Sequence, residues 1–197
     1  MLVWQKLTAA GMPVPQGFTI TTDACTQYYA DGRQINDEIT ADIFEHLKGL
    51  EEITGKKFGD NQNPLLVSVR SGARQSMPGM MDTILNLGIS DETVPAVAAM
   101  ATERFAYDCY RRFIQMYGEV VEGIAPHVFE DALSAMKHSR GVDLDTDLTE
   151  ADLKELTQQF KDLANEALGG HWTADPVEQL HRAINAVFQS WLNPRAE

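Results

Sequence analysis

An α+β fold with much more helix than strand is predicted by three observations. Apolar residues recur at helical spacing through most of the 197-residue chain. Only three short runs are rich in β-forming residues, at 18–21, 65–69 and 84–87. Glycine and proline stand at the boundaries of these segments. Because an ordinary sheet has more strands, the sequence predicts a helical domain with a small sheet, or part of a larger sheet.

Composition and charge narrow the class of protein. The apolar share of 44% and the charged share of 23% are typical of a soluble globular chain. A net charge of −13 argues against general nucleic-acid binding, which needs a basic surface. No run approaches the roughly 18 apolar residues of a membrane span, and the first residues do not resemble a signal peptide. Cys25 and Cys109 are far apart, so we expect a reducing, cytoplasmic location.

Helices are expected over most of the chain outside the three β-prone runs. The expected helices cover residues 2–10, 22–32, 35–54, 90–118, 120–124, 129–137, 149–168 and 176–191. Thr22 or Asp23 is expected to cap the second helix, Ser90 the fourth, and Asp147 or Thr149 the seventh. The last helix is expected to begin with Pro176 at its first position.

Most polar features outside the centre of the chain are assigned structural roles. Residues 143–147 have the alternating aspartates of a calcium loop, but Leu148 and Lys154 stand where glycine and glutamate are required. We therefore expect no calcium site there. The five histidines lack metal-binding spacing and are assigned to the surface or to packing. Three arginines of the long helix over 90–118 are assigned to a solvated face with internal ion pairs: Arg104, Arg111 and Arg112.

Residues 65–88 carry the most suggestive chemistry. A buried strand over 65–69 ends at Arg70, a loop of small residues contains Arg74, and a second strand over 84–87 stops at Gly88. Guanidinium groups and exposed backbone amides suit a polyphosphate ligand. An ordinary hairpin with two arginines near its tip is the alternative, and composition alone favours it.

Several motifs together resemble the pyruvate, phosphate dikinase family. They are GMPVPQGF at 11–18, TGKKFG at 54–59, VSVRSGA at 67–73, SMPGMMDTILNLG at 76–88 and RFAYD at 104–108. The resemblance is dense up to about Gly118, thins through the acidic helices and returns in the last helix. Phosphoenolpyruvate synthases and glucan water dikinases share the arginine strand, whereas MPGMMDT and TGKKFG point to the dikinases.

The resemblance implies an ATP-grasp nucleotide-binding domain, of which this chain supplies a partial α+β subdomain. Residues 1–89 match the first part of the N-terminal subdomain, residues 90–170 a large helical insertion, and residues 171–197 a helix that returns to the first subdomain. The family's phosphate-contacting lysine, its magnesium-binding residues and its phosphorylated histidine have no match here. We therefore expect a fragment that is inactive alone, with no catalytic residue and no metal ligand of its own.

The resemblance also implies the ligands ATP and Mg²⁺ and a set of phosphate-binding residues. Arg70 matches the family arginine that contacts the nucleotide phosphates, and residues 76–83 match the glycine-containing loop that folds over them. The implied phosphate-binding residues are Arg70, Ser76, Gly79, Met80, Met81, Asp82 and Thr83. For Asp82, the sequence leaves open a salt bridge to Arg74 or Arg70 and a catalytic role.

The implied function is that of part of a dikinase. The parent enzyme would transfer a phosphoryl group from ATP to a histidine on another domain and then to pyruvate, forming phosphoenolpyruvate. The implied partners are ATP, the second ATP-grasp subdomain, the phosphohistidine domain and a second copy of the parent in a homodimer, with no nucleic acid and no membrane. Two alternatives remain: a non-catalytic helical interaction protein, and a regulatory module that binds nucleotide without transferring phosphate.

Overall fold

A computed structural model describes residues 14–72 and 83–191, and this part of the chain is mostly helical. Its helices are α2 (Thr22–Ala30), α3 (Asp37–Thr54), α4 (Val94–Met100), α5 (Glu103–Val120), α6 (His127–Arg140), α7 (Glu150–Ala167) and α8 (Pro176–Ser190), with a short 3-10 helix η1 (Asp145–Asp147). The strands are β1 (Lys57–Phe58), β2 (Pro64–Leu65), β3 (Val67–Val69) and β4 (Ile84–Leu87). The predicted α+β class, rich in helix and poor in strand, is confirmed.

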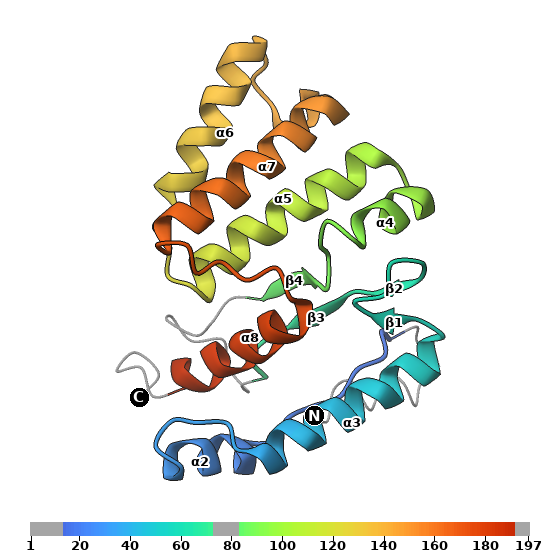
Figure 1. Ribbon diagram of the computed structural model, residues 1–197, viewed down its shortest axis with the longest axis vertical. Coiled ribbons are helices and arrows are strands. Elements are labelled where there is room, and N and C mark those ends of the chain that lie inside the picture. Colours follow the sequence, from blue (N-terminus) through green and yellow to red (C-terminus); the bar gives the residue numbers. More distant parts are fainter. Residues whose placement is uncertain (1–13, 73–82, 192–197) are drawn as a thin grey trace.

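The strands lie between two groups of helices. Figure 1 shows α4, α5, α6 and α7 at one end of the molecule and α2 and α3 at the other. Helix α8 lies beside the strands, on the side of α2 and α3. Among the described helices, none is both long enough and apolar enough to cross a membrane.

The predicted strand over 65–69 is in fact two strands with different partners. β2 pairs in parallel with β1, and β3 pairs antiparallel with β4. Leu66 separates them and belongs to neither strand. A two-residue strand such as β1 is too short to show periodicity, so it could not be predicted from the pattern of apolar residues. The β1–β2 connection is held by Asn63, whose side chain donates to the Gly55 carbonyl at 2.8 Å.

The predicted strand over 18–21 is wrong. These residues pair with no strand of the described structure, and a strand requires a partner for its backbone groups. The ring of Phe18 lies instead against His46 of α3, with the centroids 5.6 Å apart. The N-cap of α2 is Thr21, rather than Thr22 or Asp23, and its side chain makes no capping bond. The predicted helix over 2–10 lies outside the described residues.

The single helix predicted over 90–118 is broken into α4 and α5. Ala101 leaves the helical conformation at φ −136° and ψ −101°, and Thr102 is extended. The Thr102 hydroxyl accepts a hydrogen bond from the Phe105 amide at 3.1 Å, so a new helix starts there. A threonine that caps a helix competes with continuation of the preceding one, which the apolar stripe did not reveal.

Several expected helix ends are shifted. The N-cap position of α4 is Thr93 rather than Ser90, and its side chain makes no capping bond to the helix; the two side chains are hydrogen-bonded to each other in one buried turn. The predicted helix over 120–124 is wrong, because α5 runs on to Val120 and a turn follows. Of the two candidates for α7, Thr149 is the cap, and it forms a capping box with Asp152.

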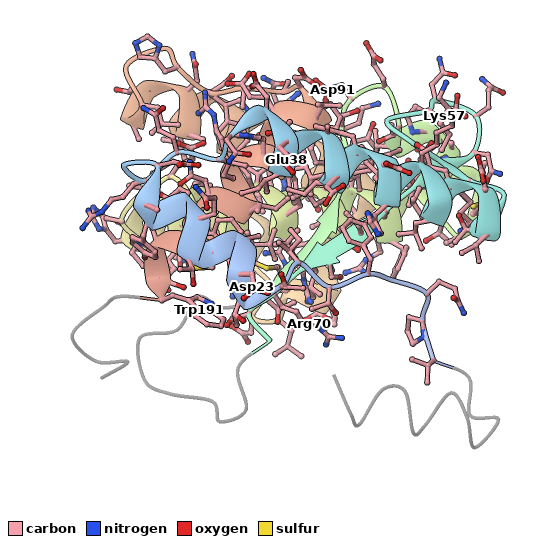
Figure 2. The ribbon with its side chains drawn as sticks, turned by 90° about the horizontal axis from the view of Figure 1, so that it is seen from below. Asp23, Glu38, Lys57, Arg70, Asp91 and Trp191 are labelled. Carbon is pink, nitrogen blue, oxygen red and sulfur yellow. The ribbon has the colours of Figure 1, made fainter. Side chains whose placement is uncertain are left out.

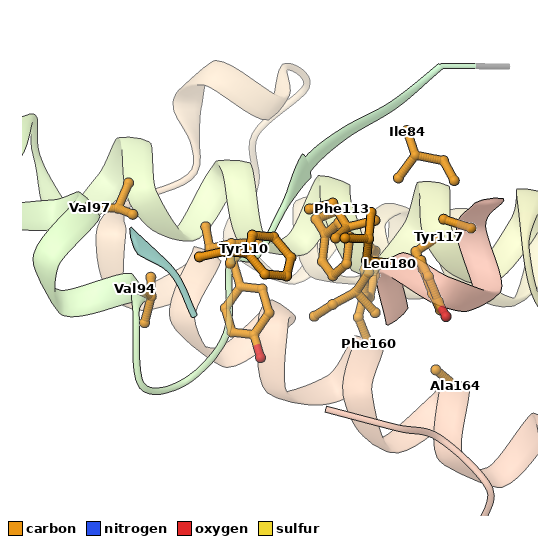
Figure 3. Packing of buried hydrophobic residues seen from close by; sticks show 14 of the residues in the cluster. Ile84, Val94, Val97, Tyr110, Phe113, Tyr117, Phe160, Ala164 and Leu180 are labelled. Atoms are coloured by element: carbon orange, nitrogen blue, oxygen red, sulfur yellow. The ribbon is translucent and has the colours of Figure 1, made fainter. Parts of the chain in front are cut away.

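One apolar core joins the helices to the strands. Phe113 of α5 and Phe160 of α7 are fully buried, and so is Ile84 of β4. Figure 3 shows these side chains together with Leu180 of α8. The strand pair β3–β4 is therefore positioned by the helices that cover it.

Candidate functional site

The open end of the β3–β4 pair brings Arg70 and Thr83 together. The antiparallel register places Val69 opposite Ile84. Arg70 and Thr83 are the next residues beyond this pair, so the two chain segments leave the sheet side by side. Arg70 is exposed and Thr83 is half-buried, and Figure 2 shows Arg70 at the edge of the described structure. A guanidinium-bearing residue and a hydroxyl-bearing residue thus stand at the same end of the strand pair.

Only these two of the predicted phosphate-binding residues can be placed. The other five lie outside the described residues: Ser76, Gly79, Met80, Met81 and Asp82. Arg70 offers a planar, always charged fork that can donate two parallel hydrogen bonds to phosphate oxygens. The Thr83 hydroxyl can donate one hydrogen bond. These are groups that suit an anionic ligand.

Helix α5 supports β4 from the helical region. Ile84 and Leu87 of β4 are both fully buried. Between them, the Leu85 amide donates to the Met116 sulfur of α5 at 3.3 Å. The strand that follows Thr83 is therefore held on α5 by both packing and a backbone hydrogen bond.

Gly88 fixes the other end of β4. Its φ of +107° belongs to the left-handed side of the backbone map, which other residues rarely adopt. A Cβ at this position would lie 2.9 Å from both the Leu65 carbonyl oxygen and the Phe58 ring. The Gly88 carbonyl in turn accepts a hydrogen bond from the buried Thr93 hydroxyl at 3.0 Å. Close packing against β1 and β2 therefore requires glycine here.

Helix α8 connects the strands to α2. The Tyr28 hydroxyl donates to the Asn185 side chain at 2.8 Å, and the Tyr29 hydroxyl donates to the Phe188 carbonyl at 2.6 Å. Asp175 caps α8 through the Val177 amide at 3.0 Å, with proline at the first helical position as predicted. These two hydrogen bonds thus join α2 to α8, whose residues lie more than a hundred positions apart in the sequence.

Two arginines assigned to a solvated face have other roles. Arg111 is only 3% exposed, and its guanidinium donates to Asp108 at 2.8 Å and to Asp145 at 3.1 Å. Arg104 donates to the backbone carbonyls of the acidic segment, including Leu148 at 2.9 Å and Asp145 at 3.0 Å. The solvated face was wrong for both, because these side chains turn inward to hold the segment 145–148, while the internal ion pair is present for Arg111, with Asp108. Arg112, at 60% side-chain exposure, agrees with it.

Asp145 is the hub of this network. Its carboxylate also accepts a hydrogen bond from Lys137 of α6 at 3.0 Å. Burial opposes ionisation of this carboxyl, but the Lys137 hydrogen bond and the charge of Arg111 outweigh burial, so its pKa lies below the usual value. Of the aspartates that suggested a calcium loop, Asp145 therefore belongs to a cross-link between α5 and α6.

One hollow of the described structure is poorly suited to an anion. A hollow of about 390 Å³ between α2 and α3 is lined by Asp23, Glu38 and Asp42, whose charges repel phosphate. Figure 2 labels two of these carboxylates. Within residues 14–72 and 83–191, no three histidine, cysteine, aspartate or glutamate side chains gather as a metal site.

Sequence reasoning missed Asn86, whose backbone lies at a φ of +59° inside β4. One signal was available. Asn86 and Gly88 are the two residue types that adopt this conformation most readily, and they stand two positions apart at the end of a strand.

Comparison with known proteins agrees with the resemblance seen in the motifs. The sequence profile of the family "Pyruvate phosphate dikinase, AMP/ATP-binding domain" matches residues 33–197. The chain is 57% identical over 193 residues to pyruvate, phosphate dikinase of Clostridium symbiosum, covering 97% of this chain and 22% of that protein. It is 49% identical over 191 residues to the chloroplastic pyruvate, phosphate dikinase of Mesembryanthemum crystallinum, covering 97% of this chain and 20% of that protein.

A third relative, pyruvate, phosphate dikinase 2 of Zea mays, is 48% identical over 192 residues, with 98% of this chain and 22% of that protein covered. The chain therefore spans about a fifth of the length of these relatives. The family profile covers most of the chain, and the resemblance inferred from the motifs is confirmed. The chain belongs to the pyruvate phosphate dikinase AMP/ATP-binding domain family.

Proposed function

We propose that this chain forms one side of the ATP site of a pyruvate, phosphate dikinase. The observation that carries the proposal is that Arg70 and Thr83 leave the β3–β4 pair side by side, in a chain whose family is described as an AMP/ATP-binding domain. Phosphoryl transfer depends mainly on positioning and on neutralising phosphate charge. Arg70 is the described residue best suited to that task at this strand end.

We further propose that Ser76, Gly79, Met80, Met81 and Asp82 complete the phosphate-binding set with these two residues. Gly79 has no Cβ, so backbone amides beside it can approach a phosphate closely. The described residues offer no set of metal ligands, and we place the Mg²⁺ ligands in other segments of the parent protein. This chain would then hold phosphate groups without coordinating the metal.

In the proposed reaction, the parent enzyme passes a phosphoryl group from ATP to a histidine on a separate domain and then to pyruvate. This chain contributes charge and position, and it supplies neither the phosphorylated histidine nor another nucleophile. We therefore propose that it is inactive alone and acts with the second ATP-grasp subdomain and the phosphohistidine domain, in a homodimeric parent. The cytoplasmic location is part of the same proposal.

We also propose that the structure divides at residues 90 and 170 into a first ATP-grasp part, a helical insertion and a returning helix. Two contacts agree with this division, although Arg182 of α8 also donates to Glu122 of the insertion at 3.0 Å. Thr157 of α7 donates to the Tyr107 carbonyl of α5 at 3.3 Å, inside the insertion. Tyr28 of α2 bonds Asn185 of α8, between the first part and the returning helix.

A chimera tests the proposed function. The matching segment of the Clostridium symbiosum dikinase is replaced by this chain, and phosphoenolpyruvate formation is measured at varied ATP. We expect activity, and we expect Arg70→Ala to lower kcat/KM for ATP by about tenfold to a hundredfold, since a charge-assisted hydrogen bond contributes about 1.5–3 kcal/mol. Arg112→Ala is the control, because this exposed arginine lies on α5 and should leave kcat/KM unchanged.

An active chimera whose kcat/KM is insensitive to Arg70→Ala would show that Arg70 does not contact the phosphates. An inactive but folded chimera, together with tight capture of a partner protein in the absence of nucleotide, would favour the helical interaction protein instead.

A further inference from the structure

Strand β4 contains an extra residue that reverses the alternation of its side chains. Leu85 and Asn86 together face the single residue Ser68 of β3. In a regular strand, residues three positions apart point to opposite faces. Ile84 and Leu87 are three apart, yet both are 0% exposed, whereas Leu85 is 45% exposed. The bulge therefore allows both ends of β4 to face the core.

The backbone conformation of Asn86 produces this bulge. Its φ of +59° lies in the left-handed region, which is the conformation that glycine usually supplies in bulges of this kind. Asparagine tolerates it better than other non-glycine residues, and β-branched residues tolerate it least. The Asn86 carbonyl also accepts a hydrogen bond from the Ile89 amide at 3.1 Å, which closes the turn after the strand.

The bulge determines which face of the sheet the residues before Asn86 point to. Leu87 is fixed by full burial and by the close packing of Gly88 next to it. If β4 were regular and Leu87 stayed in place, Leu85 and Thr83 would turn to the buried face and Ile84 would turn outward. The position of Thr83 relative to Arg70 therefore depends on a single left-handed residue three positions away.

We propose that Asn86 is a positioning residue of the phosphate site: its left-handed backbone sets the register that places Thr83 beside Arg70. The identity of the ligand rests on the proposed function, whereas the register does not. Asn86 contacts no reacting group in this scheme and acts only through the strand.

The register is tested in the chain itself, without nucleotide. Cross-strand nuclear Overhauser contacts between Val69 and Ile84, and between Val67 and Leu87, are compared in the wild type, Asn86→Gly and Asn86→Val. We expect Asn86→Gly to keep both contacts and Asn86→Val to lose the Val69–Ile84 contact while Val67–Leu87 remains. Arg33→Val is the matched control, since Arg33 also has a left-handed φ, of +66°, but lies in the exposed turn after α2.

Arg33→Val should lower stability and leave both cross-strand contacts intact. If Asn86→Val lowers stability and also keeps the Val69–Ile84 contact, Asn86 is merely structural and the proposal is wrong. If Asn86→Val does not fold, the same two cross-strand contacts are measured in Asn86→Ala, and the proposal stands or falls on the Val69–Ile84 contact in that variant.

The chimera supplies the functional readout. We expect Asn86→Gly to retain kcat/KM for ATP and Asn86→Val to lose roughly tenfold to a hundredfold, because small displacements of binding groups have effects of this size. A shifted register with unchanged kcat/KM would overturn the positioning role. A wild-type chimera without activity would contradict the proposed function and leave the register result standing.

Discussion

The helical region and the strand region of this molecule are stabilised in different ways. In the helical region, Phe129 of α6 and Phe160 of α7 are fully buried with their ring centroids 5.0 Å apart. In the strand region, each sheet has two strands of two to four residues. Two-stranded sheets of this length are marginal by themselves. The strands that carry the candidate site are therefore held by contacts with helices rather than by their own ladder.

This difference shows where precision at the site comes from. The Leu85 amide bonds Met116 of α5, and Gly88 packs on Phe58 and Leu65. Because these contacts join segments distant in sequence, the site should respond to changes in the helices, whereas the helices should respond little to changes at Arg70. Three predictions compare how strongly the contacts of the two regions stabilise the fold, through the free energy of unfolding.

The largest effect is expected in the helical core. Phe160→Ala should lower the free energy of unfolding by about 3–5 kcal/mol, because it leaves a cavity among fully buried rings. Urea denaturation measures this change. Phe105→Ala is the matched control: Phe105 is 54% exposed on α5, and its loss should change stability by no more than about 0.5 kcal/mol. If the two variants lowered the free energy of unfolding by similar amounts, the buried helical core would not be the main source of stability.

The second effect compares three glycines. Gly88→Ala should cost about 2 kcal/mol or more, because it combines backbone strain with contacts of 2.9 Å. Gly55→Ala also places alanine at a positive φ, +67° against +107° at Gly88, with no neighbour within 4 Å, so strain alone should cost about 1 kcal/mol. Gly49→Ala, inside α3 and in open space, should stabilise by up to about 1 kcal/mol. Equal costs at Gly88 and Gly55 would show that the β4 packing contributes nothing.

The smallest effect is expected at the Asp145 network. Asp145→Asn should cost about 1 kcal/mol near neutral pH, a modest value because the side chain is 35% exposed. Its folded pKa is depressed, so the stabilisation is present above the unfolded pKa and is lost as pH falls through the folded pKa. The wild type and variant should therefore converge in acid, measured by urea denaturation from pH 7 to pH 2.

Asp143→Asn is the control for that series, because Asp143 is exposed in the same segment and should show no such convergence. A pH-independent difference between wild type and Asp145→Asn would mean that the carboxylate charge is not what holds Arg111 and Lys137.

Local patterns predicted much of the helical region. The apolar repeat over 35–54 predicted α3, and Gly55, a left-handed glycine, marked its end. Its start was predicted two residues early, because the cap at Asn36 was not identified. Asp175 and Pro176 gave the start of α8 in the same way. The motifs also led to the family, since they are runs of residue types rather than contacts.

Long-range features were not predictable in this way. The inward turn of Arg104 and Arg111 depends on where residues 145–148 fold back, about forty positions later. The failure of the strand over 18–21 depends on the lack of a neighbouring strand in the described structure, which composition does not report. An arginine can face the solvent or turn inward, and a β-prone segment can pair or stay unpaired, so the residue types did not decide either case.

By itself, the sequence determined the helical periods, the start of α8 and the family, because each depends on residues close together along the chain. Tertiary structure alone decided that 65–69 is divided between two sheets, that Asn86 is left-handed, and that Arg70 and Thr83 meet at one strand end. The physical reason is that strand register is set by hydrogen bonds and packing between distant segments, and a shift of one residue reverses every side chain without changing the local sequence.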